Sequence, residues 1–259
     1  MMVLTHSPFQ PTPDSPDWDP KTKSEAEQQD VKHFADMTAY TDQMVGRVVA
    51  KLEELKLNEN TLLIFIGDNG TLGSVTSRFN GSDFKGGKGK TTHRGTHVPC
   101  LVSWPAATKQ PSVNADLISS TDFLPTICEA AGIDEPAEID GVSFLPQLRG
   151  EVGKPREWLY SWYSPRQGTD LTVQECAFDH RFKLYRTGDF FDLTKDPDEK
   201  NALAVATLNG DTAAAASSLQ ATLDRFKDVR PAELDRQLKN SNPQSNKKKK
   251  QNSKAKAIE

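Results

Sequence analysis

Apolar residues follow different spacings along the chain, and each spacing predicts a different element. Between Val31 and Leu57 they recur every three or four positions, which predicts an amphipathic helix with an apolar stripe facing a sheet. Residues 61–66 form an unbroken apolar run, which predicts a strand buried on both faces, as in a parallel sheet. A helix is also expected over residues 117–131, with a kink or a break at Pro125 because proline cannot donate the helical hydrogen bond.

The pattern changes after Gly150, where alternating and aromatic residues predict short strands followed by a helix. Strands are expected over residues 158–163, 173–178, 181–186 and 190–193. The pair Asp179-His180 predicts the turn between the second and the third strand. Residues 203–226 are rich in alanine and interrupted at Gly210, and they predict a final helix.

Two glycine-flanked motifs contain candidate residues for binding a metal ion and an anion. Gly67-Asp68-Asn69-Gly70 follows the apolar run, at the end of a strand where open α/β sheets build their sites. Aspartate and asparagine offer hard oxygen donors, which suit Ca²⁺ or Mg²⁺. Gly86-Gly87-Lys88-Gly89 places a point charge on a glycine-rich loop, which suits sulfate or phosphate. Each motif alone also fits an ordinary turn or loop, but together they predict hydrolysis of a sulfuryl or phosphoryl ester.

Further segments lie before and after these two motifs in a fixed order. They are Tyr40 to Gly46, Asn60-Thr61, Gly95, Val98-Pro99, Trp104-Pro105, Asp122 to Thr126, Ala131 to Ile133, Asp140 to Ser143, Phe190 to Leu193 and Asp196 to Asn201. With the two motifs, this order resembles the type I sulfatases of the alkaline phosphatase superfamily, over about Thr5 to Leu203.

The resemblance implies an α/β fold in which part of an alkaline-phosphatase-like sheet, with flanking helices, is joined to a small C-terminal α+β domain. Residues 1–150 are expected to form the C-terminal part of the catalytic α/β domain. Residues 151–236 are expected to form the small domain, an antiparallel sheet with a helix packed on it.

The resemblance also assigns roles to individual residues. His6 lies in the segment that carries the family's active-site histidine, which contacts the ester and protonates the leaving oxygen. Lys88 is expected to bind the ester oxygens and to take part in catalysis, while Asp68 and Asn69 hold Ca²⁺, with Mg²⁺ also possible. An ordinary loop histidine remains the alternative for His6.

A cationic stretch follows the lysine loop, where many sulfatases carry an acidic residue and two glycines. Here His93, Arg94 and His97 are candidates for recognising an anionic substrate, such as a sulfated polysaccharide with carboxylates or further sulfates. A surface loop with incidental charge fits equally well, and a structural contact is open for His97, where the family often has arginine.

The nucleophile of the family is not found in this sequence. It is a formylglycine made from a cysteine or serine with proline two residues later and arginine two beyond that. The chain has three cysteines, Cys100, Cys128 and Cys176, and none of them has proline at that spacing. The nearest serine match, Ser103-Trp104-Pro105, lacks the arginine. We therefore expect the chain to be the C-terminal portion of a sulfatase, with the formylglycine in the missing N-terminal part. Alone it is expected to be inactive, to bind Ca²⁺ poorly and to keep an open sheet edge.

Charge is unevenly distributed along the 259 residues. The formal net charge is −4, but residues 239–259 contain seven lysines and one glutamate, a net of +6, which leaves −10 for the preceding part. We expect residues 237–259 to be a disordered lysine-rich tail, since they cannot bury enough apolar surface to offset the entropy of ordering. A solvated tail explains the lysines more simply than a nucleic-acid or membrane surface, so no nucleic-acid partner is expected.

Two other functions stay open at this point. One is a phosphodiesterase or phosphonate hydrolase of the same superfamily, and the other is a non-catalytic protein that binds sulfated glycans. The expected partner is a sulfated small molecule or polysaccharide. No run of about eighteen apolar residues predicts a membrane span, and the first residues are too short a run for a signal peptide. The family resemblance alone implies a periplasmic or secreted enzyme.

Overall fold

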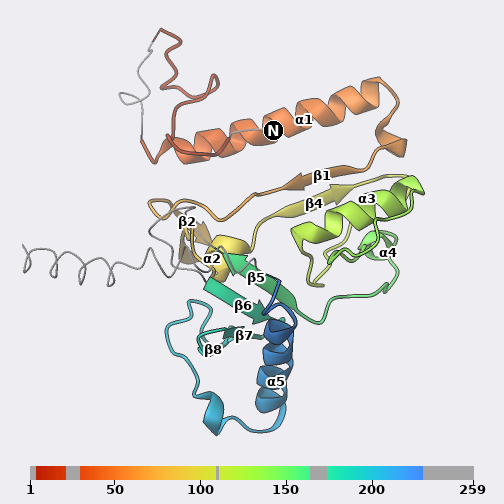
Figure 1. The fold of residues 1–259 in the computed structure, drawn as a ribbon. Helices are drawn as coiled ribbons and strands as arrows, with labels where there is room; N and C mark the ends of the chain where they lie inside the picture. The colour runs from red at the N-terminus through yellow and green to blue at the C-terminus, as the bar shows by residue number, and fades with distance from the viewer. Residues whose placement is uncertain (1–3, 22–29, 109–110, 164–173, 230–259) are drawn as a thin grey trace, which may run out of the picture. The chain divides into compact units, whose positions relative to one another are not determined.

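The computed structural model describes residues 4–21, 30–108, 111–163 and 174–229, so the predicted tail at 237–259 lies outside the described residues. The chain divides into two compact units, and Figure 1 labels most of their helices and strands. The first comprises Met1–Val113 with Gln147–Glu151, and the second comprises Asn114–Pro146 with Val152–Glu259.

The first unit contains one long helix and two small antiparallel sheets. Its elements are α1 (His33–Glu54), the 3-10 helix η1 (Asn58–Asn60), β1 (Leu63–Ile66), β2 (Thr76–Phe79), β3 (Ser82–Lys85), α2 (His93–Thr96) and β4 (Cys100–Ser103). Strand β1 pairs with β4, and β2 pairs with β3 in a hairpin.

The pairing of β1 corrects one prediction. The apolar run does form a strand, but β1 pairs antiparallel with β4, with Ile66 opposite Cys100. Ile66 is 40% exposed and Leu101 on β4 is 60% exposed, so the two strands are not buried on both faces. The run shows that these residues can be buried, whereas burial itself depends on the elements that cover them.

Helix α1 is covered over only part of its predicted apolar stripe. Met37 is buried and packs with Phe9 and Val75, which come from two other segments of the unit. Further along the helix, Val48 is 49% exposed, so the stripe does not lie fully against a sheet. No helix in the described part of the chain is both long and apolar enough to cross a membrane.

The second unit begins with helical segments: η2 (Ser120–Asp122), α3 (Phe123–Ala131) and α4 (Leu145–Leu148), the last of which ends in the first unit. The expected kink at Pro125 is wrong because α3 begins only at Phe123. Pro125 therefore lies in the first turn, where a backbone N–H would have no partner within the helix. Helix α3 ends at Ala131 and is capped by Gly132, whose positive φ of 65° suits glycine.

A four-stranded antiparallel sheet and one helix complete the second unit. The strands β5 (Leu159–Tyr163), β6 (Gln174–Phe178), β7 (Phe182–Tyr185) and β8 (Phe190–Asp192) lie in sequence order. The 3-10 helix η3 (Val205–Thr207) precedes α5 (Gly210–Arg225), so the predicted last helix starts at Gly210 rather than before it. The predicted turn is formed by the Asp179 carboxylate, which accepts hydrogen bonds from the backbone N–H groups of Arg181 and Phe182.

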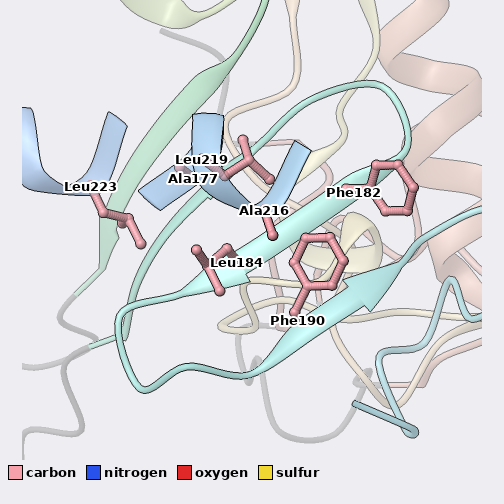
Figure 2. Close-up of a cluster of buried hydrophobic side chains, with 7 residues drawn as sticks. All are labelled: Ala177, Phe182, Leu184, Phe190, Ala216, Leu219 and Leu223. Carbon is pink, nitrogen blue, oxygen red and sulfur yellow. The ribbon is translucent and has the colours of Figure 1, made fainter. Parts of the chain in front are cut away.

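The core of this unit lies between α5 and the sheet (Figure 2). Helix α5 contributes Ala216, Leu219 and Leu223, and the last two are at most 1% exposed. They pack against strand residues that are equally apolar, namely Ala177, Phe182, Leu184 and Phe190. Burial of these side chains is the main favourable term for this unit.

An ion pair ties residues 114–146 to the rest of the second unit. The Asp122 carboxylate, 1% exposed, accepts hydrogen bonds from the Arg156 guanidinium and from the Val142 N–H. The compact units accordingly divide after Val113. The domain boundary expected after Gly150, between residues 1–150 and 151–236, stays a prediction.

A second ion pair predicts how stability depends on pH. Hydrogen bonds from Arg181 and Thr194 hold the pKa of the Asp192 carboxyl well below its usual range. The folded state therefore favours the carboxylate, and this stabilisation is present above the ordinary pKa of about 3.9 and lost as the pH falls through the lowered value. We expect Asp192→Asn to melt at a lower temperature than the wild type at neutral pH, with a smaller difference at about pH 3. The exposed Asp134→Asn is the control; an equal deficit at both pH values would contradict the prediction.

Candidate functional site

The Asp68-Asn69 turn begins two residues after β1 and is fixed by its flanking glycines. The Gly67 N–H donates to the Pro99 carbonyl at 3.0 Å, and the Gly70 N–H donates to the Gly95 carbonyl at 2.9 Å. A Cβ atom at Gly70 would lie 2.0 Å from the Arg94 carbonyl oxygen, so only glycine allows this approach. Asp68 is exposed and Asn69 is half-buried, which leaves the aspartate open to a ligand from solvent.

The lysine loop is bonded to the residues that follow this turn. The Lys88 N–H donates to the Thr71 carbonyl at 2.9 Å, and Thr71 comes three residues after Asp68. A Cβ at Gly87 would lie 2.5 Å from the Arg94 Cβ, and one at Gly86 would lie 2.3 Å from the Leu72 carbonyl oxygen. The glycines therefore let two loops about twenty residues apart in sequence pack backbone against backbone. The structure brings the Asp68 turn and the Lys88 loop together.

The candidate substrate residues lie on and beside the short helix α2. Its Gly95 is buried, and a Cβ there would lie 2.1 Å from the Lys90 carbonyl oxygen. The rings of His93 and His97 meet edge to face, with 5.8 Å between their centres. His97 is exposed and His93 is half-buried, so His97 is the more accessible of the two. Their predicted contact with substrate stays a prediction.

Arg94 has structural partners that the sequence did not indicate. Its guanidinium lies 4.5 Å from the ring centre of Phe84 and donates to the Lys85 carbonyl at 3.1 Å. Both residues belong to β3, in the hairpin between the two motifs. That hairpin was missed, although the pair Asn80-Gly81 between two short runs is a hairpin signal. Arg94 thus fixes the hairpin as well as carrying charge beside it.

His6 lies in a segment anchored on the same unit. Its side chain is exposed, and its Nδ1 atom lies 2.5 Å from the Ser7 carbonyl oxygen. Three residues later, Phe9 is 3% exposed and packs with Met37 and Val75. Because Val75 belongs to the stretch between the two motifs, the segment of His6 packs on that stretch. Convergence of the His6, Asp68, Asn69 and Lys88 side chains in one pocket stays a prediction.

The oxygen ligands in this region are of the kind that Ca²⁺ binds, but they are too few to complete its coordination. Asp68 and Asn69 supply hard oxygens, whereas Ca²⁺ takes about six to eight. Within the described residues there is no group of three or more His, Cys, Asp or Glu side chains that could hold a metal ion. These residues therefore form at most part of a calcium site.

None of the cysteines occupies this region as an activated nucleophile. Cys128 is half-buried on α3, and Cys176 is buried on β6, where desolvation raises the pKa of its thiol to about 11. Desolvation also raises the pKa of the Cys100 thiol on β4. A thiol with a raised pKa is a weak nucleophile at neutral pH.

Comparison with known proteins agrees with the motifs. Residues 1–133 match the family model described as Sulfatase, and residues 91–228 match the one described as N-sulphoglucosamine sulphohydrolase, C-terminal. The chain is 38% identical to steryl-sulfatase of Mus musculus over 207 residues, which are 66% of this chain and 33% of that protein. It is 36% identical to arylsulfatase A of Homo sapiens over 133 residues, 51% of this chain and 26% of that protein. The chain thus spans about a third or less of the length of these curated relatives.

Solved structures agree on the fold. A structure solved in complex with its substrate, D-glucosamine-2-N,6-O-disulfate, superposes with a TM-score of 0.63 at 21% identity, over 79% of this chain and 42% of that one. The expected fold class, part of an alkaline-phosphatase-like sheet with helices and a small α+β domain, is confirmed. With a family model matched over half of its length, this chain belongs to the sulfatase family.

Proposed function

We propose that this chain supplies part of the active site of a sulfuric ester hydrolase that removes sulfate from a carbohydrate or aryl ester. The observation that carries the proposal is the locked pair of loops, in which Gly70 bonds to Gly95 and Lys88 bonds to Thr71. This pairing sets an acidic turn beside a lysine loop, an arrangement suited to a metal and an oxyanion bound side by side. The solved neighbour with a disulfated glucosamine supports a sulfated sugar as substrate.

Each residue of the site has a distinct proposed role. Lys88 is exposed on its loop and would bind the ester oxygens through its charge. His6, also exposed, would contact the ester and give a proton to the leaving oxygen. Asp68 and Asn69 would hold Ca²⁺ as two of its ligands; a bound metal supplies positive charge that stabilises the ester's charge during reaction. Further oxygen ligands and water would complete the coordination of the metal.

Sulfate binding tests the role of Lys88 without requiring turnover. Titration of the purified chain with inorganic sulfate, followed by calorimetry or by NMR shifts, should show saturable binding that Lys88→Ala weakens by about tenfold, the equivalent of about 1.4 kcal/mol. Lys90→Ala is a matched control, since Lys90 is exposed on the same loop two residues away. Equal losses in both variants would indicate general charge rather than a site at Lys88, and no loss in either would contradict the proposed function.

A turnover assay tests whether the purified chain hydrolyses sulfate esters. Because the sequence lacks the formylglycine motif, we expect no release of sulfate from aryl sulfates or sulfated glycans by the purified chain with Ca²⁺. Release would be measured with a chromogenic aryl sulfate and by ion chromatography. Metal-dependent release that Lys88→Ala abolishes would show that the chain has a nucleophile of its own. Secretion or a periplasmic location stays an expectation from the family.

A further inference from the structure

The hairpin between the two motifs shows a surface that the proposed catalytic roles do not use. Strands β2 and β3 are exposed along their whole length, and they are joined by Asn80-Gly81. Both turn residues have positive φ, 48° and 78°, as a tight two-residue hairpin turn requires. The hairpin is therefore well specified by its own sequence, although two strands alone are only marginally stable in water.

The two faces of this hairpin differ in chemistry. In the observed register Ser77 pairs with Phe84, and Phe79 pairs with Ser82. Because side chains alternate between the faces, these four residues share one face. The phenyl rings meet edge to face with 6.1 Å between their centres, yet Phe79 is 64% exposed and Phe84 is 41% exposed. One face of the hairpin thus carries two accessible rings and two hydroxyls.

The opposite face and the flanking loop carry positive charge. Arg78 pairs with Asp83 at 2.9 Å across the hairpin, and Lys85 lies on the same face. Arg94 adds its guanidinium over the Phe84 ring. From residue 71 to residue 97 there are five lysines and arginines and one aspartate, a net charge of +4 in a chain whose total is −4. This local excess favours an anionic ligand.

The aromatic face leads directly into the lysine loop. The Gly86 N–H donates to the Val75 carbonyl at 2.9 Å and closes the base of the hairpin beside Lys88. Lys88 comes only four positions after Phe84 in the sequence, so their Cα atoms lie at most about 14 Å apart. A ligand with a sulfate at Lys88 can therefore extend along the hairpin.

We propose that the aromatic face of the β2–β3 hairpin binds the sugar rings of an anionic, sulfated oligosaccharide whose scissile sulfate lies at Lys88. Phe79 and Phe84 stack on the apolar faces of the rings, the serine hydroxyls bond to sugar hydroxyls, and Arg94 attracts neighbouring sulfates or carboxylates. The substrate class of the site is then an acidic glycan rather than a small aryl ester. The proposal rests on the proposed function, because it extends the ligand of Lys88.

Binding of a chondroitin sulfate hexasaccharide to the full chain, measured by calorimetry, tests this proposal. We expect Phe79→Leu and Phe79→Ala to weaken binding by about tenfold, as for loss of one stacked ring. Phe79→Tyr should bind like the wild type because it keeps an aromatic face. Trp18→Ala, another exposed aromatic residue of the first unit, is the control and should change nothing. Circular dichroism checks that each variant is folded, which is expected since Phe79 is mostly exposed.

Further binding measurements distinguish a failure of the hairpin proposal from a failure of the proposed function. Inorganic sulfate should bind equally to the wild type and to Phe79→Ala, and Lys88→Ala should weaken both sulfate and hexasaccharide. If Phe79→Ala binds the hexasaccharide like the wild type, the hairpin does not bind the sugar rings, although Lys88 can still bind sulfate. Unchanged sulfate binding in Lys88→Ala would instead overturn the proposed function. Tighter binding of decathymidylate or of desulfated chondroitin than of the sulfated hexasaccharide would also overturn the glycan proposal.

Discussion

Asp122→Ala should lower the free energy of unfolding of the second unit by about 3–5 kcal/mol, because it leaves a buried arginine without its partner. Arg156 is only 11% exposed at its side chain, and Asp122 accepts its Nε hydrogen bond at 3.0 Å. The same carboxylate caps the backbone N–H groups of Ser119 and Val142. Alanine would remove all of these acceptors at once, while water cannot fully replace them at a buried site.

Thermal and urea unfolding would measure this loss, with a melting temperature expected to fall by about 10 °C. The control is Asp134→Ala, since Asp134 is an exposed aspartate of the same unit. The double variant Asp122→Ala with Arg156→Met removes both charges and should recover part of the loss. A change of less than about 1 kcal/mol for Asp122→Ala would show that the pair does not hold residues 114–146 in place.

Lys183→Met should lower the free energy of unfolding of the second unit by a similar amount, about 3–5 kcal/mol. Here the partner left unpaired is a buried carboxylate rather than a buried arginine. The Lys183 side chain is 1% exposed and its Nζ lies 2.9 Å from Oε1 of Glu199, which is itself 5% exposed. Tyr185 donates its hydroxyl to the other oxygen of Glu199, and the ammonium also lies 5.1 Å from the Tyr185 ring centre. Methionine fills the space but leaves the Glu199 carboxylate buried without a cation.

A double-mutant cycle distinguishes this cause from simple loss of packing. Lys183→Met combined with Glu199→Gln should be more stable than Lys183→Met alone, since no buried charge then remains unpaired. Lys195→Met is the control, because the Lys195 side chain is 77% exposed. Equal unfolding free energies for the single and double variants would show that the ion pair is not the source of the effect.

The sequence predicted the small sheet and its helix because the signals there are local. Alternation along residues 174–178 and 182–185 places Ala177 and Leu184 opposite each other, facing α5. The Asp179 turn follows from the ability of its carboxylate to accept nearby N–H groups. In these segments the residues whose pattern predicts each strand or turn are also the residues that make its stabilising contacts.

The first unit shows why the rest could not be predicted. The pairing of β1 with β4 joins residues about forty positions apart, and nothing in the apolar run specifies the direction of that partner. The two loop motifs were identified because glycine permits contacts that other residues forbid. The position of Arg94 over Phe84 depends on the fold of the hairpin, so the charge of Arg94 could be predicted but its neighbours could not.

In the proposed function, the Asp68 turn and the Lys88 loop together form one site for a metal and a sulfate. Coupling between the two ligands tests it most directly: the affinity of the chain for sulfate is measured with and without Ca²⁺. We expect Ca²⁺ to bind weakly, with a dissociation constant of about a millimolar, and to raise the affinity for sulfate. Asp68→Asn should abolish this effect, whereas Asp83→Asn, on the hairpin, should keep it. An affinity for sulfate that does not depend on Ca²⁺ in the wild type would contradict a shared site.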